Sequence, residues 1–412
     1  MNREKFKVYK TIIVGGGMAG LVSATLLSKK FGGENVAVLE RLNRVGKKIL
    51  STGNSQCNLT NENILLSNYH GTDTSFIDHA ITNYNKESLI AFFENLGIKL
   101  CIDNNKYYPL SKQASSVLDS LRFNLEYLKV NIFTEQKVVK IKKDNHFVLT
   151  TENGEKFYAE NVIVAVGGKS AKHLGTDGSS YNLLTDFGHT LTKLYPSLVQ
   201  LKCEKEKIKG LKGLKAQVSL FGKTDKVTSP KFNGEILFTD YGLSGNAVFS
   251  VSSYLAGQVG SKIYVDFCKA MTACELETFI KNKLANCPYL TCENLLSGII
   301  PNKIAQRLFL NNGIALDSTS KNINIKKIVS FIKNTEYTVV GDLGFDNSQV
   351  THGGISTNEF DSKTMQSKLI KGLYAVGEVL DIDGDCGGYN LQWAYSSAVT
   401  ACKDIKWVNF LT

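Results

Sequence analysis

The chain has 412 residues, more than one hydrophobic core usually organises, and 43% of them are apolar, so two or three folded domains are expected. No apolar run approaches the length of a membrane span, and Arg3, Lys5 and Lys7 precede no signal-peptide segment, which favours a cytoplasmic protein with no membrane partner. The nine cysteines are an odd number without a Cys-x-x-Cys pair, which favours free thiols, and their spacings match no metal module.

The net charge of +10 raises the question of a nucleic-acid partner. Much of this charge lies in the runs 202–231 and 321–333, and in the first run lysines alternate with apolar residues, as on the solvated faces of strands. No RNA- or DNA-binding motif accompanies either run. We therefore expect an anionic ligand or plain solubility rather than a nucleic acid, while the oligomeric state stays open.

The first stretch with a clear pattern has the order strand, glycine loop, helix, strand and acid. The order runs through the apolar run 11–14, the loop Gly15-Gly16-Gly17-Met18-Ala19-Gly20, the helical pattern 21–30, the apolar run 35–39 and Glu40. A Gly-x-Gly-x-x-Gly motif alone is weak, because a glycine-rich turn can open any β-α unit. In this complete setting it predicts a dinucleotide site.

Each part of the motif has a physical role in such a site. Gly15 permits a tight turn, Gly17 lets a pyrophosphate approach the backbone, and Gly20 lets the helix pack close to the strand. The helix N-terminus offers free N–H groups and the positive end of its dipole to the phosphates. Glu40 is placed to accept hydrogen bonds from a ribose. The cofactor residues expected here are Gly15, Gly17, Met18, Ala19, Gly20 and Glu40.

A long polar loop, 41–61, follows the second strand and is expected at the carboxyl edge of the sheet, where doubly wound folds bind ligands. Its lysines can offset phosphate charge, and its short polar side chains can form hydrogen bonds. The alternative is a mobile surface loop, but loops of this length in compact domains are usually functional or disordered. The residues expected to line the cofactor are Arg41, Lys47, Lys48, Ser51, Asn54, Cys57 and Asn58.

Further α/β elements follow up to about residue 166. Helices are expected within 75–96 and over 112–129, and strands over 130–134, 137–142, 147–151, 156–158 and 161–166. Asn153-Gly154 indicates a hairpin turn, and the last strand, which is strongly apolar, suits a buried parallel sheet. Val138 and Gly167 are expected near the cofactor. The order resembles that of FAD-binding domains related to glutathione reductase.

The pattern changes near residue 190 and returns near residue 348. Strand-like runs (197–201, 216–220, 236–239, 262–267) precede helical ones (272–284, 304–311, 325–333), which indicates an inserted β-rich domain with a helical part over about 270–335. We therefore expect a nucleotide domain over 1–189, the insertion over 190–347, and the rest of the nucleotide domain over 348–412.

The late segment 381–390 is glycine-rich and opens a helix that we expect to reach about residue 406. Backbone N–H groups at that helix start would stabilise negative charge on the N1–C2=O side of a reduced flavin. The alternative is a glycine turn without a ligand. An apolar strand ending in Gly377-Glu378 precedes this segment, and the expected cofactor residues are Gly377, Glu378, Asp381, Gly387, Gly388, Tyr389, Asn390 and Leu391.

The catalytic group stays unassigned at this level. Only one Gly-x-Gly-x-x-Gly occurs, so no second nucleotide domain is expected, and Cys57 and Cys386 suit packing better than nucleophilic roles. A general acid or base is sought among four candidates, each of which is more often structural. They are His352, Tyr389, Tyr241 and Asp240.

Several of these segments together resemble a bacterial family of FAD-dependent flavoproteins that includes a 3-dehydro-bile-acid reductase and an aminoacetone oxidase. The matching segments are IIVGGGMAG, GKKILSTGNSQCNLTN, AVGGKS with GTDGSSY, FTDYGLSG, QVTHGGIS and TMQSKLIKGLYAVGEVLDIDGDCGGYNLQWAYSSA. The resemblance implies a Rossmann-like FAD domain with an inserted β-barrel-like domain and a small helical domain. It also implies that the FAD site is lined by Gly15, Gly17, Gly20, Glu40, Lys48, Ser51, Asn54, Gly377, Glu378, Gly388, Asn390 and Leu391.

The chain departs from that family at two places. Ser55-Gln56 stands where the family usually has Gly-Arg, and Asn246 stands where it usually has proline. Losing the arginine removes a cation near the flavin. We expect an FAD oxidoreductase that moves a hydride through flavin N5 from NAD(P)H to an activated C=C bond or a similar acceptor in a small molecule. The alternatives are an amine oxidase that uses O2, and a non-catalytic or RNA-associated flavoprotein.

Overall fold

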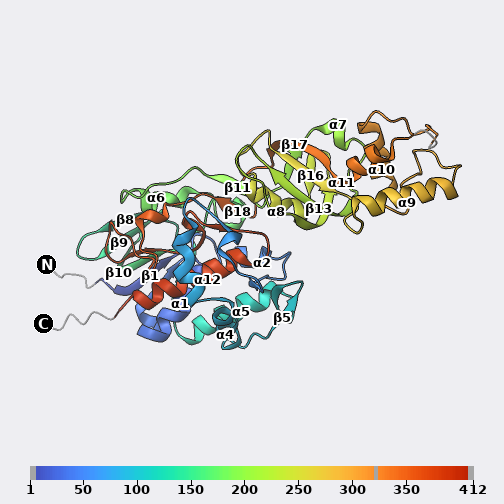
Figure 1. Ribbon diagram of the computed structural model, residues 1–412. Helices are drawn as coiled ribbons and strands as arrows, with labels where there is room; N and C mark the ends of the chain where they lie inside the picture. The colour runs from blue at the N-terminus through green and yellow to red at the C-terminus, as the bar shows by residue number, and fades with distance from the viewer. Residues whose placement is uncertain (1–5, 320–322, 407–412) are drawn as a thin grey trace. The chain divides into compact units, whose positions relative to one another are not determined.

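A computed structural model of the chain describes residues 6–319 and 323–406 (Figure 1). The chain divides into two compact units, which are described separately. Unit 1 is Met1–Leu194 with Val350–Thr412, and unit 2 is Tyr195–Gln349. Arg3, Lys5 and the first residues of the basic run 321–333 lie outside the described residues. No helix in the described part of the chain is long and apolar enough to span a bilayer.

Unit 1 is built on a seven-stranded sheet in the order β7-β2-β1-β10-β9-β8, with β19 paired to β10. The strands are β1 Val8–Val14, β2 Val36–Leu39, β7 Asn131–Phe133, β8 Val138–Lys143, β9 Phe147–Thr151, β10 Lys156–Val164 and β19 Leu373–Ala375. The pairs β1–β2, β2–β7, β1–β10 and β10–β19 are parallel, whereas β8 and β9 form an antiparallel meander. The predicted Rossmann-like fold with an inserted meander is confirmed.

One strand prediction was wrong. The runs 156–158 and 161–166, expected as separate strands, form the single strand β10, which ends at Val164. Its first half pairs with β9, and its residues from Tyr158 to Val164 pair with β1, from Val8↔Tyr158 to Val14↔Val164, so no break separates the two runs. The hairpin at Asn153-Gly154 is confirmed, and Gly154 has φ +84°, a value that favours glycine.

Helices cover this sheet and bring the two ends of the chain together. Helix α12 packs against α1, and Figure 1 shows the red and blue helices side by side. The helices of unit 1 are α1 Met18–Phe31, α2 Lys47–Ser51, α3 Asp78–Asn83, α4 Lys86–Glu94, α5 Ala114–Tyr127, α6 Asn182–Thr185 and α12 Tyr389–Asp404. The stretch 75–96 is split because the Asn85 side chain accepts the Ser88 N–H at 3.1 Å and starts a new helix.

Short strands join the beginning and the end of unit 1 again. β4 Tyr69–His70 pairs antiparallel with β20 Asp383–Gly384, which places His70 opposite Asp383. β3 Thr60–Asn61 pairs with β6 Lys106–Pro109, which also pairs with β5 Leu100–Asp103. The polar stretch 41–61 is therefore not wholly irregular, since it contains α2 and β3. A last short strand is β18 Val350–His352.

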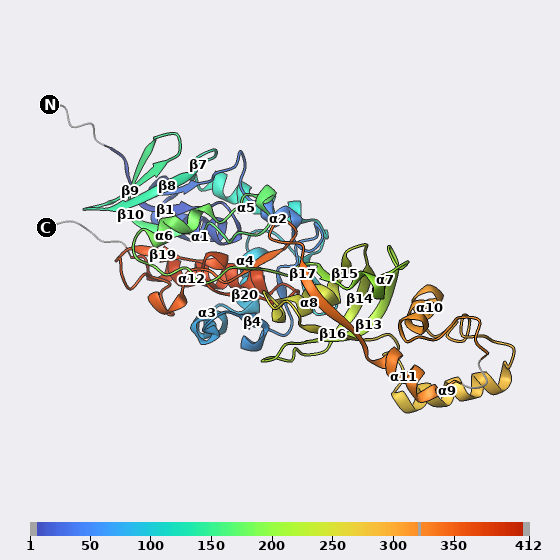
Figure 2. The same ribbon diagram turned by 90° about the horizontal axis from the view of Figure 1, so that it is seen from above.

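Unit 2 is a closed barrel in the order β12-β15-β14-β13-β16-β17 with helices attached, which confirms the predicted barrel-like and helical parts. Its strands are β11 Tyr195–Ser197, β12 Leu201–Cys203, β13 Lys215–Lys223, β14 Phe232–Phe238, β15 Gly242–Ser244, β16 Lys262–Asp266 and β17 Thr335–Asp342. Its helices are α7 Lys205–Ile208, α8 Asn246–Tyr254, α9 Ala273–Asn286, α10 Asn302–Asn311 and α11 Ile325–Lys333, and Figure 2 shows α9 beside α11. Buried side chains such as Val218, Ile236 and Ile263 form a core separate from that of unit 1.

Candidate active site

The three glycines of the motif after β1 occupy their positions for different structural reasons. Gly15 has φ +105° and a Cβ there would lie 2.4 Å from the Ala165 carbonyl oxygen, while a Cβ on Gly20 would lie 1.9 Å from the Gly15 carbonyl oxygen. Both glycines are required by the packing of the chain itself. A Cβ on Gly17 would meet no heavy atom of the described residues within 4 Å, and its φ is an ordinary −81°. Gly17 therefore leaves open space at the N-terminus of α1, where a phosphate fits.

Glu40 is held at the end of β2 by backbone donors. It is 8% exposed, and its carboxylate accepts the N–H groups of Gly16 and Leu42, both at 2.8 Å. Burial raises the pKa of Glu40, and the two hydrogen bonds act in the opposite direction. Arg41, expected at the cofactor, instead binds Asp177 through two hydrogen bonds of 2.7 and 3.0 Å.

The end of the chain contacts two early segments of unit 1, the start of α1 and the strand β3. A Cβ on Gly377 would be 3.4 Å from the Ala19 Cβ. The Asn61 amide donates to the Gly387 carbonyl oxygen at 2.9 Å, and a Cβ on Gly388 would lie 2.6 Å from the Thr60 carbonyl oxygen. Segments more than 300 residues apart in sequence thus form one site within unit 1.

An ion pair crosses the same region. Lys48 Nζ on α2 lies 2.9 Å from Glu378 Oε2, and the two side chains are 24% and 17% exposed. The other Glu378 oxygen accepts the Thr351 N–H at 2.9 Å. A Cβ on Gly167 would lie 3.9 Å from Glu378 Oε2, so three of the predicted cofactor residues converge here. Because Lys48 already forms an ion pair with Glu378, this carboxylate competes with a phosphate group for the charge of Lys48.

The loop before α12 is held by hydrogen bonds within the loop itself. Gly388, the N-cap, has φ +100°. The Asn390 side chain accepts the Gly384 N–H and donates to the Gly384 carbonyl oxygen, both at 2.8 Å, so it holds the loop. Tyr389 is 8% exposed and packs edge-on against Tyr69, and burial raises its pKa to about 12. A phenol that holds its proton this firmly is a poor proton donor near neutral pH.

Two buried acceptors at the site have no hydrogen-bond partner among the described residues. They are Asn58 Oδ1, which lies 2.9 Å from where a Gly388 Cβ would be, and Gln136 Oε1. The Gln136 N–H donates to the Glu40 carbonyl oxygen at 2.8 Å, so this residue lies at the ribose end of the predicted site. FAD carries N–H donors on both its flavin and its adenine ring. The open space at Gly17 and these two unsatisfied acceptors fit that cofactor.

The other predicted lining residues lie in unit 1 with different exposures. Cys57 is fully buried and burial raises its pKa to about 12, which supports a packing role. Asp381 is 2% exposed and accepts the Thr72 hydroxyl at 2.5 Å. Ser51 and Asn54 are exposed. Of the rest, Val138 and Met18 are buried, and Lys47 and Leu391 are partly buried.

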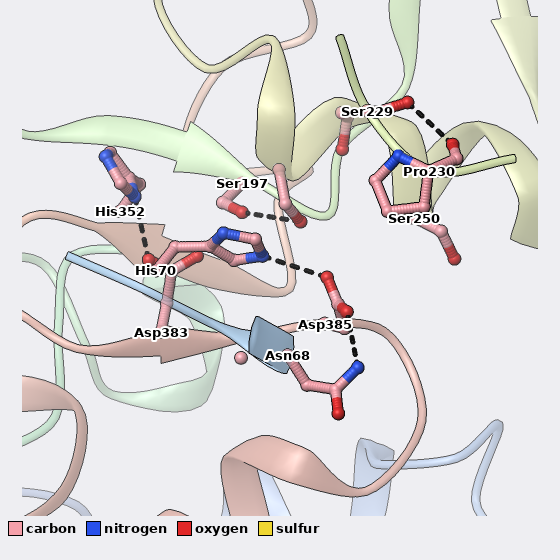
Figure 3. A network of polar contacts seen from close by, with 12 residues as sticks. Asn68, His70, Ser197, Ser229, Pro230, Ser250, His352, Asp383 and Asp385 are labelled. Carbon is pink, nitrogen blue, oxygen red and sulfur yellow. Dashed lines mark hydrogen bonds and ion pairs between the residues drawn. The ribbon is translucent and has the colours of Figure 1, made fainter. Parts of the chain in front are cut away.

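Two histidines bond to buried aspartates along β20 (Figure 3). His352 Nδ1 lies 2.8 Å from Asp383 Oδ1, and His70 Nε2 lies 2.9 Å from Asp385 Oδ1. Burial alone would lower the pKa of His352, but its hydrogen bond to Asp383 and the charges of Asp383 and Asp381 outweigh the effect of burial, so this pKa is raised. The arrangement can hold a proton beside the loop that opens α12.

Known proteins match this chain over nearly its whole length. The family model described as the HI0933-like protein Rossmann domain matches residues 9–404. The chain belongs to this family. It is 37% identical to the 3-dehydro-bile acid delta(4,6)-reductase of Clostridium scindens over 94% of this chain and 97% of that one. It is 30% identical to the ribosomal RNA dihydrouridine synthase of Haemophilus influenzae over 96% of this chain and 98% of that one.

Among solved structures, the 3-ketosteroid-delta4-(5alpha)-dehydrogenase of Rhodococcus jostii RHA1 aligns with a TM-score of 0.48 and 13% identity, covering 98% of this chain and 99% of that one. That likeness is too distant to carry a function. The HI0933-like family, the dinucleotide motif and the reductase relative identify the chain as an FAD-dependent oxidoreductase.

Sequence patterns did not identify two residues of the candidate site in this HI0933-like protein, and two of the proposed catalytic candidates lie in the other unit. His70 lies in no motif, and the one signal for it is the alternation of acids at 381, 383 and 385, which predicts partners on one face of a strand. Gln136 carries no signal. Asp240 and Tyr241 belong to unit 2, where exposed Asp240 pairs with Lys212 at 2.8 Å, so these two candidates lie outside unit 1 and stay predictions.

Proposed function

We propose that this HI0933-like protein reduces a C=C bond conjugated to a carbonyl group in a small molecule, using NAD(P)H as electron donor. The observation that carries the proposal is that unit 1 brings Gly377 against Ala19 of the first glycine motif and the loop that opens α12 against Thr60 and Asn61, while the same loop region carries a proton-holding His352–Asp383 pair. FAD, when bound, takes up two electrons and delivers them as a hydride. The chain's own task is to bind the cofactor, orient the acceptor and provide a proton.

The names of the two relatives support the reaction class. A 3-dehydro-bile acid delta(4,6)-reductase and a dihydrouridine synthase both add two hydrogen atoms to a C=C bond that is conjugated to a carbonyl group. These acceptors differ in size and charge but share the same reacting group. The sequence contains one Gly-x-Gly-x-x-Gly motif, so we propose that NAD(P)H docks transiently and has no domain of its own.

A uridine in RNA is the second candidate acceptor. It is favoured by the relatives named rRNA dihydrouridine synthase and by unit 2, whose sequence has 19 Lys and Arg against 13 Asp and Glu. Against it, many of these lysines form ion pairs with carboxylates of unit 2 itself, so fewer of them are available to contact a phosphate backbone. The paired lysines are Lys207, Lys209, Lys212, Lys215, Lys262, Lys281 and Lys333. We therefore place the small-molecule acceptor first.

We place this activity in the cytoplasm. All nine cysteines are free thiols, which suits a reducing compartment.

The test separates the two half-reactions. The oxidised, yellow protein is mixed anaerobically with NADH or NADPH, and the flavin absorbance should bleach. The reduced protein is then mixed with cyclohexenone, with testosterone or with unmodified ribosomal RNA, and the product is analysed by mass spectrometry for two added hydrogen atoms. Absence of bleaching with either nucleotide refutes the donor. Reoxidation by RNA alone selects the second candidate, and bleaching by aminoacetone with peroxide on aeration selects the amine oxidase expected as an alternative.

A further inference from the structure

The strand β20 lies between two histidines that come from distant parts of the chain. β4 pairs with β20 and carries His70, and β18, which contacts β20, carries His352. The aspartates on β20 and just after it are buried, with Asp383 0% and Asp385 6% exposed. Figure 3 shows both imidazole rings directed towards these carboxylates. A buried carboxylate beside a histidine fixes the ring orientation and stabilises its charged form.

We infer that His352 is the catalytic residue that donates a proton to the acceptor, and that Asp383 is the positioning residue that holds it. The inference rests on the proposed function, because a conjugated alkene is not fully reduced by a hydride alone. His352 differs from His70 in access, since its side chain is 29% exposed and that of His70 is 13% exposed. A ring with one edge on a buried carboxylate and a larger exposed area is suited to meet a substrate.

The proton balance of the reaction requires such a donor. The π bond of the conjugated alkene breaks, one of its carbons gains a hydride whose electron pair originates from NAD(P)H, and the charge moves onto the carbonyl oxygen as an enolate. The neighbouring carbon then takes a proton from the His352 imidazolium, which leaves a neutral imidazole, and solvent returns the proton. The net change is the addition of one hydride and one proton across the double bond.

Other titratable groups of unit 1 are less suited to this role. The pKa of Tyr389 is raised to about 12 by burial, so its hydroxyl gives up a proton far less readily than an imidazolium. His189 has a fully buried side chain stacked on Phe360, and burial lowers its pKa, so its charged form is disfavoured. Asp381 is buried and already accepts hydrogen bonds from Thr72.

The charges around His352 determine the direction of its pH dependence. Asp383 and Asp381 face it from the β20 segment and favour the imidazolium. His70 pairs in register with Asp383 and binds Asp385, and the backbone of Lys193 lies against Gly353, next to His352. Because the net influence is negative and the proton donor is the charged form, proton donation declines as pH rises through the raised pKa of His352.

The experiment measures three quantities for wild type and for His352→Gln: FAD content, the rate of bleaching by NADPH, and the rate of reoxidation by the acceptor that wild type reduces. We expect FAD content and bleaching within about threefold of wild type, and reoxidation slowed about a hundredfold or more. His146→Gln, in the turn between β8 and β9, is the matched control and should match wild type in all three. Circular dichroism checks folding, and added imidazole should restore reoxidation in His352→Ala.

A second readout does not depend on turnover. The imidazole of His352, assigned by its loss in His352→Gln, is titrated by NMR in wild type and in Asp383→Asn. We expect a pKa above the usual value near 6.5 in wild type and a value lower by about one unit or more in Asp383→Asn. The decline of the reoxidation rate with pH should move by the same amount.

The outcomes separate the two claims. If wild type reduces an acceptor but His352→Gln reoxidises at a similar rate, or if imidazole does not rescue His352→Ala, the assignment of His352 is wrong while the function stands. If the pH profile does not move in Asp383→Asn, the positioning role of Asp383 is wrong. If wild type reduces no conjugated alkene, the function fails and the inference fails with it.

Discussion

Gly17 allows the requirements of ligand binding to be tested separately from those of folding, because the folded chain itself does not need a glycine at this position. In Gly17→Ala the new Cβ would meet no heavy atom of the described chain within 4 Å, and the backbone at φ −81°, ψ −169° is one that alanine adopts. Alanine is a poorer N-cap than glycine by about 0.5–1 kcal/mol. Its smaller freedom in the unfolded chain restores about 0.4–1 kcal/mol. The free energy of unfolding of the apoprotein should therefore change by less than about 1 kcal/mol.

The same methyl group should weaken FAD binding strongly. It occupies the open space in front of the α1 N-terminus, where a pyrophosphate would accept backbone N–H groups. A hydrogen bond to a charged group contributes about 1.5–3 kcal/mol, and at about 1.5–2 kcal/mol each the loss of two of them costs about 3–4 kcal/mol. We expect the dissociation constant for FAD to rise by about two to three orders of magnitude.

The assay compares urea unfolding of the apoproteins with FAD binding measured by calorimetry. Gly20→Ala is the matched contrast, because its Cβ would lie 1.9 Å from the Gly15 carbonyl oxygen. It should destabilise the apoprotein itself by about 1–3 kcal/mol. If Gly17→Ala binds FAD within about threefold of wild type, the reasoning about this loop is refuted.

Three further predictions concern stability. Ser55 is exposed and has φ +64°, a left-handed conformation that costs serine more than glycine. Ser55→Gly relieves this strain but adds conformational entropy to the unfolded chain, so it should raise the free energy of unfolding in urea by about 0.5–1 kcal/mol. A decrease would contradict this. A double-mutant cycle with Lys48→Met and Glu378→Gln should give a coupling energy of about 1 kcal/mol, because this half-buried ion pair lies between fully exposed and fully buried pairs in strength. A value near zero would mean that the ion pair is not formed. The hydrogen bonds from Arg41 hold the pKa of Asp177 below its usual range, so its ionised form stabilises the fold above about pH 4, and this contribution is lost as pH falls through the lowered pKa. Asp177→Asn should therefore flatten the acid limb of the unfolding free energy measured against pH, and an unchanged limb would contradict the assignment.

Local patterns were sufficient for the parts of the fold that are close in sequence. The βαβ order around Gly15–Gly20 and the turn at Gly154 were visible because their turns and apolar runs are contiguous. The barrel was harder to predict. Strand β17 closes it by pairing with β12 and β16, yet a long helical stretch separates β16 from β17, and such non-local pairing leaves no trace in local periodicity. Likewise β15 is only three residues long.

The candidate site shows the same division. The glycines were predictable, because backbone conformation and close approach dictate them. Side-chain partners were not, since they depend on distant segments: Arg41 binds Asp177, Lys48 binds Glu378, and the amide of Asn390 holds its own loop. His352 could be proposed from its glycine-rich surroundings, but only the fold places Asp383 against it.

The most direct test of the account is an experimental structure of the protein with FAD. The account predicts one FAD per chain, with its pyrophosphate at Gly15–Gly20, its ribose at Glu40 and its flavin ring at the N–H groups that open α12. A flavin located away from Gly388, or a folded protein that takes up no FAD, would contradict it.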